Sequence, residues 1–239
     1  MSSKSNTKRG GRRPDLIRAA RRLFFSRGYA GTTIEQAARA AGFSKRTVYL
    51  YFKNKDDLFI SVAEEGLVKL RRNLETVAVA DLGVEPSIAA IMEIYMDFAH
   101  QNPEYFRMIF RECSPDMVAN VSEELRRRLE DHEHACLNVV ATVVDVAVTE
   151  GRMPRIDRWE TAVMFWGMAT GILLLSLAGS QAVFGRSTRE ELISKAIWIL
   201  YAGLRETDDY FRATGNQKTE QADKPTRAKR GGRKKAGRA

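Results

Sequence analysis

Small polar and cationic side chains are concentrated between residues 44 and 51. The run contains Ser44, Lys45, Arg46, Thr47, Tyr49 and Tyr51. At the start of a helix, hydroxyl, ammonium and guanidinium groups can hydrogen-bond to base edges in the major groove of DNA. The tyrosine hydroxyls can donate to phosphate oxygens. This run therefore predicts a helix that binds DNA.

Three further side chains could hold phosphate. Lys55 can reach the DNA backbone as a point charge. Thr32 and Thr33 lie at the expected start of another helix, where hydroxyls and free amide groups suit a phosphate oxygen. The alternative is that the two threonines only cap that helix. Likewise, Lys45 and Arg46 could simply form a solvated helix end.

The patterns of catalysis and metal binding are weak in this sequence. It contains no nucleophile elbow, phosphate loop or pair of catalytic carboxylates, so we do not expect an enzyme. Asp131–His134 holds two histidines two positions apart, which point to nearly opposite sides of a helix. Only His100 remains to help them, so we expect no metal ion and no cofactor. Cys113 and Cys136 are expected to be buried thiols in a reducing cytoplasm.

Two short helices must position the polar run. Thr32, with Glu35 three residues later, predicts a capping box at the start of one helix, and Gly42 ends it. Ser44 caps the next helix, which we expect over 45–52. Two short helices joined by a tight glycine-containing turn form a helix-turn-helix pattern.

Helical patterns continue on both sides of this pair, and no segment alternates convincingly as a strand does. A helix is expected from Pro14 to Gly28, and another from the Asn54 cap. Further helices are expected over 86–101 and 103–112, over 116–150 as either one continuous or one broken helix, after Asp157, and after Ser187 or Thr188. The prediction is an all-α protein of about nine helices: an N-terminal three-helix helix-turn-helix domain and a larger helical domain for ligand binding and dimerisation.

The segment from Gly28 to Leu58, GYAGTTIEQAARAAGFSKRTVYLYFKNKDDL, resembles the DNA-binding domain of TetR-family transcriptional regulators. The resemblance covers about 45 residues. It implies a homodimer in which each protomer lays its third helix in the major groove. Arg46 stands where many members have a small residue, and Leu50 where a polar or aromatic one is common. Leu50 could touch a thymine methyl group or simply pack.

Beyond residue 58 the sequence resembles the family less closely. The resemblance still implies an effector pocket in the larger domain and a dimer formed by the last two helices. Pocket candidates are Phe98, Phe106, Met108, Phe110, Phe165 and Met168. Dimer candidates are Trp166, Gly167, Gly171, Leu174, Ala178, Ile193 and Trp198. For each pocket candidate, ordinary core packing is the alternative.

One uncharged stretch, 161–185, requires a choice between a membrane span and a buried helix. It contains four glycines as well as hydroxyl and amide side chains, and nothing hydrophobic precedes it to start insertion. We therefore expect a buried helix at a subunit interface and no membrane partner.

Charge is distributed unevenly along the chain. Residues 1–14 carry five Lys and Arg, and 224–239 carry eight, without any acid; 15–58 has a net charge of +5 and 59–223 of −9. The predicted arrangement is a disordered basic arm (1–13), a TetR-type helix-turn-helix domain (14–58), an effector-binding and dimerisation domain (59–210), and a disordered basic tail (211–239). Arg9, Arg12 and Arg13 of the arm could follow the DNA backbone or enter a minor groove.

The sequence thus predicts a transcriptional regulator in the bacterial cytoplasm, associated with the nucleoid. Its expected partners are double-stranded DNA, a second copy of itself, and a small apolar or amphipathic effector that releases it from a palindromic operator. The alternative is a nucleoid-organising protein whose larger domain serves only dimerisation.

Overall fold

The computed structural model describes residues 4–80, 82–177 and 187–213, and these contain ten α-helices, one π-helical turn and no strand. The elements are α1 (Lys4–Arg27), α2 (Ile34–Ala40), α3 (Lys45–Tyr49), α4 (Lys55–Ala78), α5 (Val84–Gln101), α6 (Pro103–Arg107), η1 (Met108–Glu112), α7 (Pro115–Asn120), α8 (Glu123–Thr149), α9 (Arg158–Leu177) and α11 (Arg189–Ala213). The predicted all-α fold is confirmed.

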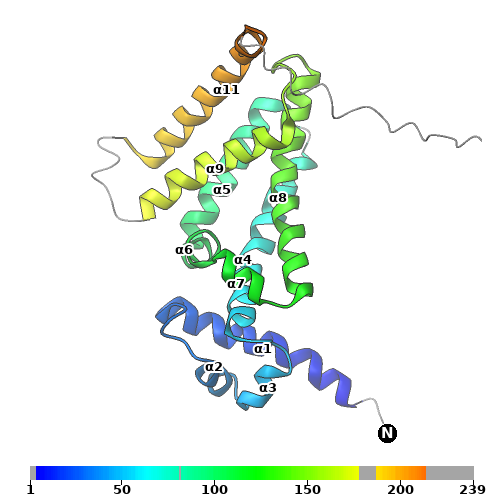
Figure 1. Ribbon diagram of the computed structural model, residues 1–239, viewed down its shortest axis with the longest axis vertical. Coiled ribbons are helices and arrows are strands. Elements are labelled where there is room, and N and C mark those ends of the chain that lie inside the picture. Colours follow the sequence, from blue (N-terminus) through cyan, green and yellow to red (C-terminus); the bar gives the residue numbers. More distant parts are fainter. Residues whose placement is uncertain (1–3, 81, 178–186, 214–239) are drawn as a thin grey trace, which may run out of the picture.

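The described residues form two hydrophobic cores. Figure 1 shows α1, α2 and α3 at one end of the molecule and α9 and α11 towards the other. We call α1–α3 and the start of α4 the head, and the remainder the body. The head core joins α1–α4 to side chains of η1, α7 and the start of α8, among them Met108 and Leu125. The body core lies among α4, α5, α8, α9 and α11. Helix α4 runs through the predicted boundary at residue 58 without a break, so it connects the two cores.

Most helix starts follow the predicted caps. The Ser44 and Asn54 side chains accept hydrogen bonds from backbone N–H groups at the starts of α3 and α4. Asp157 accepts from two backbone N–H groups at the start of α9. Gly28 and Gly42 follow α1 and α2 with φ of +67° and +74°, the left-handed region that favours glycine. Local capping chemistry therefore sets most of these boundaries.

Two expected boundaries near the N-terminus are wrong. The capping box of α2 is formed by Thr33 and Gln36, one residue later than expected, because Thr32 is buried. Helix α1 begins at Lys4 rather than Pro14, so 4–13 is helical instead of a disordered arm. Pro14, which was expected to begin this helix, lies inside it. The other predicted domain limits stay predictions, and the tail beyond 213 lies outside the described residues.

Candidate nucleic-acid interface

One face of α3 is buried in the head and the other is open to solvent. Val48 is buried in the head core, as is Phe52 just after the helix. Ser44, Lys45, Arg46 and Tyr49 are exposed, whereas Thr47 and Tyr51 are half-buried. The structure thus brings the polar run onto one open surface, where it can meet a groove of DNA. Leu50 belongs to that surface: it is 67% exposed, so it does not simply pack.

Several of these side chains are held in position. The Ser44 and Thr47 hydroxyl oxygens are 2.9 Å apart, and the Ser44 oxygen also accepts from the Thr47 backbone N–H. Lys45 forms an ion pair with Glu35 of α2, and its ammonium lies 5.9 Å from the centre of the Tyr49 ring. The side chains at the start of α3 are therefore held in place by contacts within the head.

The two threonines differ in what they can do. Thr32 is 1% exposed; its hydroxyl donates to the Gly28 carbonyl and its N–H to that of Tyr29. With both donors engaged, Thr32 is not placed to bind phosphate. Thr33 is exposed at the N-terminus of α2, where its hydroxyl accepts from the Gln36 N–H. It remains a candidate phosphate contact.

Lys55 lies at the start of α4, over an aromatic ring. Its ammonium is 3.9 Å from the centre of the Tyr29 ring, whose hydroxyl donates to Asp56. Partial burial lowers the pKa of Lys55. Burial and the Asp56 carboxylate raise the pKa of Tyr29 to about 12, so the phenol stays protonated. Exposed Lys53, which is not among the predicted DNA contacts, lies two residues earlier, between α3 and α4.

The structure places the predicted arm arginines differently. Arg12 lies 5.9 Å from the centre of the Phe43 ring. The Arg13 guanidinium lies 5.4 Å from the centre of the Phe52 ring and donates a hydrogen bond to the Ser61 hydroxyl at 3.3 Å. Both therefore pack against the head in α1 rather than extend from it. The Arg9 side chain lies outside the described residues, although its backbone is in α1.

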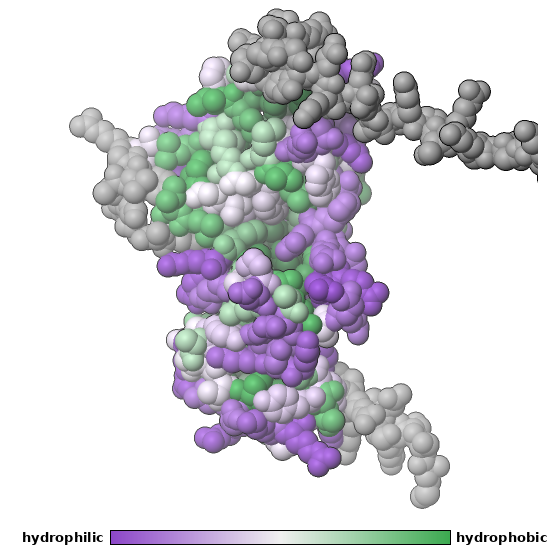
Figure 2. Space-filling view, in the orientation of Figure 1, coloured by the Kyte–Doolittle hydropathy of each residue, from purple (hydrophilic) through white to green (hydrophobic). Residues whose placement is uncertain are grey.

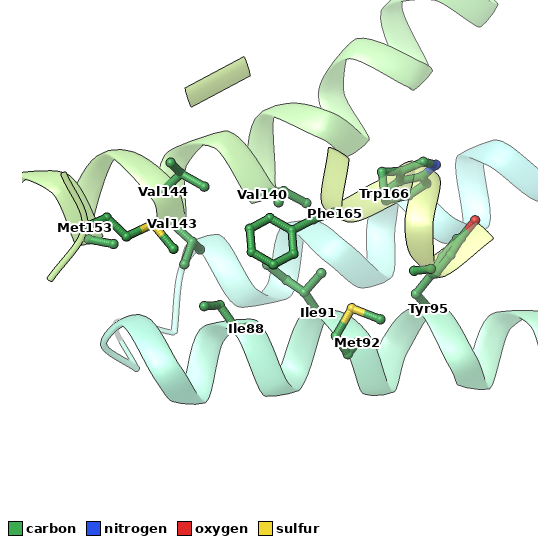
Figure 3. Close-up of a pocket in the computed structure, with 12 residues that line it drawn as sticks. Ile88, Ile91, Met92, Tyr95, Val140, Val143, Val144, Met153, Phe165 and Trp166 are labelled. Atoms are coloured by element: carbon green, nitrogen blue, oxygen red, sulfur yellow. The ribbon is translucent and has the colours of Figure 1, made fainter. Parts of the chain in front are cut away.

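The body contains an apolar cavity between α5, α8 and α9 (Figure 3). Its free volume is about 30 Å³, room for about one or two water molecules. It is lined by Ile88, Ile91, Met92, Tyr95, Val140, Val143, Val144, Ala147, Met153, Phe165, Trp166 and Ala169. In Figure 3 the Phe165 ring projects between α5 and α8. An effector would have to separate these helices.

Most of the predicted pocket residues lie elsewhere. Of the six, only Phe165 lines this cavity. Phe98 and Phe106 are fully packed in the body core, and Met108 belongs to the head core. Phe110 and Met168 pack against the body core from its edge. Core packing, the alternative that the sequence left open, describes Phe106, Met108 and Met168, whereas Phe98 and Phe110 also line two other hollows of about 200 and 180 Å³.

The predicted dimer residues divide into two groups. Gly167, Gly171 and Trp198 are exposed, Trp198 at 69%, and Leu174 is half-buried. Trp166 instead lines the cavity, 4.5 Å from Tyr95 between ring centres, and Ile193 is 1% exposed in the body core. These two point inward because they lie on the inner faces of α9 and α11. Ala178 lies outside the described residues.

Two family models match the chain. "Bacterial regulatory proteins, tetR family" matches 16–62, and "Tetracyclin repressor-like, C-terminal domain" matches 88–197. The chain belongs to the TetR family. This TetR-family protein is therefore a DNA-binding transcriptional regulator from a non-enzymatic family, as predicted. A bacterial regulator of this kind works where the chromosome is, which implies the cytoplasm.

Relatives of this TetR-family protein extend over most of its length. The HTH-type transcriptional regulator SrpR of Pseudomonas putida is 26% identical over 197 residues, 81% of this chain and 85% of SrpR. FadR from Bacillus halodurans has the same fold, with a TM-score of 0.62 and 18% identity over 82% of this chain and 97% of that one. FadR from Bacillus subtilis, solved with stearoyl-CoA, also has this fold, with a TM-score of 0.59. It is 18% identical to this chain, and the match covers 80% of this chain and 97% of that one.

Metal and membrane chemistry have little support in the described residues of this TetR-family protein. They contain no group of three His, Cys, Asp or Glu side chains that could hold a metal ion. Cys136 is buried as expected, but Cys113 is partly exposed, and both are free thiols.

Helix α9, over Arg158–Ser176, is long and apolar enough to cross a membrane, a criterion that core helices also meet. It packs against α8 and α11.

Proposed function

We propose that this TetR-family protein is a homodimeric repressor that binds a palindromic operator and is released by a small apolar or amphipathic molecule. The observation that carries the proposal is the open face of α3. Ser44, Lys45, Arg46 and Tyr49 share it, while Val48 fixes the opposite face in the head core. This arrangement presents donors to base edges on a rigid element.

Dimerisation is supported by an apolar surface on the body. Figure 2 shows hydrophobic side chains gathered over the end of the molecule that holds α9 and α11. The exposed large apolar residues there are Val163, Met164, Leu175, Trp198 and Ile199. A Cβ added to Gly167 or Gly171 would meet open space, so these positions allow another helix to approach closely. An isologous interface between two copies would cover this face.

An effector site is supported by the cavity between α5, α8 and α9. Its lining is almost wholly apolar, and B. subtilis FadR, which shares the fold, was solved with stearoyl-CoA. For this chain we infer a ligand with an acyl chain or a similarly apolar body. Because only about 30 Å³ is free, binding must favour a second, more open conformation. DNA release follows if the heads are misplaced in that conformation.

Footprinting on DNA upstream of the protein's own gene tests the proposal. We expect a protected palindrome whose half-sites lie about one helical turn, ~34 Å, apart. The operator should be preferred over random DNA by about 10³ or more. Arg46→Ala should weaken operator binding about tenfold or more. Uniform binding to all sequences would instead support a nucleoid-organising protein.

The dimer is tested separately by light scattering during size exclusion. Gly171→Leu adds bulk where the protomer has open space, so we expect a folded monomer with a normal circular dichroism spectrum. Thr142→Leu, on an exposed part of α8, serves as the control and should remain dimeric. A Gly171→Leu protein that dimerises as tightly as the parent would remove α9 from the interface.

The effector is tested by titrating the operator complex with acyl-CoA of increasing chain length. Release should strengthen with chain length and weaken in Val140→Ile, whose one extra methylene fits the small free volume of the cavity, while operator binding by that variant persists. Release that is unchanged in the variant would place the effector elsewhere.

A further inference from the structure

Arg46 and Leu50 form the outermost ridge of α3, which we call the α3 ridge. Each of them is two positions away from Val48, whose side chain is fully buried in the head core. Two residues turn an α-helix by about 200°, so both side chains point away from the head. Leu50 keeps this geometry because its backbone is still helical, with φ of −75° and ψ of −19°. A helix seated in the major groove presents such a ridge to the base pairs.

Leu50 is an apolar side chain on a surface that is otherwise rich in hydrogen-bonding groups. Among the head residues from Gly11 onward, whose burial the structure describes, the exposed large hydrophobic side chains are Tyr49 and Leu50. Tyr49 carries a hydroxyl, and its ring lies near the Lys45 ammonium. Leu50 offers no hydrogen bond, is 67% exposed and belongs to neither hydrophobic core. Its side chain is therefore free to contact an apolar group on DNA.

The edges of the base pairs offer one apolar group in the major groove, the C5 methyl of a pyrimidine. Thymine carries this methyl in ordinary DNA, and 5-methylcytosine carries it in methylated DNA. Against any other base edge, the Leu50 side chain would cover a donor or an acceptor without bonding to it, which is unfavourable. Leu50 therefore favours a methylated pyrimidine both by contact and by disfavouring the alternatives.

Arg46 lies one turn before Leu50 on the α3 ridge. Its guanidinium is exposed and makes no hydrogen bond or ion pair with the residues that the structure describes. It is therefore available for the O6 and N7 atoms of guanine, the usual target of arginine in the major groove. Four residues extend about 6 Å along a helix, and successive base pairs lie ~3.4 Å apart. The two side chains can therefore reach bases that are about two base pairs apart.

We propose that Leu50 is a specificity-determining residue that contacts the C5 methyl of a thymine in each operator half-site. The thymine lies within about two base pairs of a guanine that Arg46 binds. An operator is needed for this contact, so the inference rests on the proposed function. It adds to that function the identity and spacing of two bases in each half-site.

Deoxyuridine in place of thymine tests Leu50, because the replacement removes the methyl group and leaves base pairing intact. Each thymine of the footprinted operator is replaced in turn, and binding of the full chain is measured by fluorescence anisotropy. For the parent we expect at least one thymine in a half-site whose replacement weakens binding about fourfold, the effect of exposing one methyl group. Leu50→Ala should bind the two operators equally at that position. Tyr49→Ala, which truncates the neighbouring exposed side chain, is the control and should keep the fourfold difference.

Cytosine and 5-methylcytosine at the same position separate the methyl group from the rest of thymine. The parent should bind the 5-methylcytosine operator about fourfold more tightly than the cytosine operator. Leu50→Ala should bind both equally. For Arg46, the replacement is 7-deazaguanine, which lacks the N7 acceptor. It should weaken binding by the parent but not by Arg46→Ala, at a guanine within about two base pairs of the sensitive thymine.

Several outcomes would overturn the proposal. They are equal binding of all deoxyuridine operators by the parent, a methyl effect that survives in Leu50→Ala, and a sensitive guanine that lies farther from the thymine. Because Leu50 is largely exposed, we expect Leu50→Ala to unfold at the same temperature as the parent. A protein that prefers no DNA sequence would reject the proposed function and this contact with it. A preferred operator without a methyl effect would reject the contact alone.

Discussion

At the scale of single residues, Lys45 has an ion-pair partner within the protein. Its ion pair with Glu35 joins α3 to α2 on the face that we assign to the major groove. The bond to Lys45 lowers the pKa of Glu35, and the same bond raises that of Lys45, so both groups are charged at neutral pH. A phosphate or base that takes Lys45 must compete with this carboxylate.

Glu35→Gln should therefore strengthen DNA binding, by up to about fivefold. The substitution releases Lys45 and removes a negative charge from a surface that faces phosphates. Fluorescence anisotropy with operator and random duplexes at several salt concentrations measures it. Asp15→Asn, which removes an exposed carboxylate paired with Arg18, is the control. Equal or weaker binding by Glu35→Gln would show that Glu35 positions Lys45 rather than competing for it.

Gly66 is a second residue whose type is dictated by a neighbour. A Cβ at this position would lie 2.9 Å from three atoms of Tyr105. The Tyr105 ring is fixed, since its hydroxyl donates to Glu65 at 2.8 Å and accepts from Arg21 at 3.3 Å. Arg21, in α1, also pairs with Glu65 of α4 at 3.1 Å, so this cluster joins the head to α6.

Gly66→Ala should lower the free energy of unfolding by about 1 kcal/mol. Overpacking costs about 1–3 kcal/mol, and the better helix propensity of alanine returns about 1 kcal/mol. Urea denaturation measures the change. In a Tyr105→Ala background the same substitution should cost less, because two of the three close atoms, Cγ and Cδ1, are gone while Cβ remains. A loss of equal size in both backgrounds would rule out the contact with Tyr105 as the cause.

At the scale of helices, most elements could be predicted because their signals are local. Ser44, Asn54 and Asp157 cap the helices that they were expected to cap. The shift from Thr32 to Thr33 was not predictable in the same way, since two adjacent threonines offer the same cap. Burial of Thr32 in the folded head decides between them.

The cavity was harder to predict than the helices. Which aromatic side chain faces a cavity depends on how α5, α8 and α9 cross, and sequence alone does not specify that. Phe98 and Phe165 have the same chemistry, but one is packed in the core and the other lines the cavity. The aliphatic lining of α8, including Val140 and Val144, is indistinguishable in the sequence from core.

The contact between α4 and α8 contains a partly buried histidine, His132. His132 lies 3.8 Å from Glu64, which also holds Arg128 in a two-bond ion pair. Burial, together with the cations Arg71 and Arg128, lowers the pKa of His132. Protonation is then easier in the unfolded chain, so this group costs stability as pH falls below its ordinary pKa of about 6.5.

His132→Gln should reduce the loss of stability between pH 7 and pH 5. Urea midpoints measured across this range at one protein concentration report the effect. His134→Gln, on the same helix but exposed, should retain the full pH dependence of the parent. If the His132→Gln profile matches that of the parent, the histidine is not what makes this contact sensitive to pH.

At the scale of the whole molecule, the head and the body carry net charges of opposite sign. The basic head lies at one end, and α9 and α11 lie at the other (Figure 1). Residues 59–223 have a net charge of −9, so the body is repelled by DNA and helps to orient the head towards it. The eight basic residues of 224–239 follow this acidic region in the sequence.

Deletion of 224–239 should weaken binding to operator and random DNA alike. A basic segment that does not contact base edges adds affinity through contacts to phosphates. Its loss should therefore also make binding depend less steeply on salt concentration. Anisotropy titrations at four salt concentrations test this, with deletion of 214–223 from within the intact tail as the control. Weaker binding to the operator alone would mean that the tail contributes to specificity.

Helix α4 gives the protein a lever of known length. Its 24 residues span about 36 Å at 1.5 Å per residue. A rotation of only about 5° at its body end would move its other end by about 3 Å, close to the ~3.4 Å rise of one base pair. Helices that part slightly deep in the body can therefore put each head out of step with the duplex by about one base pair.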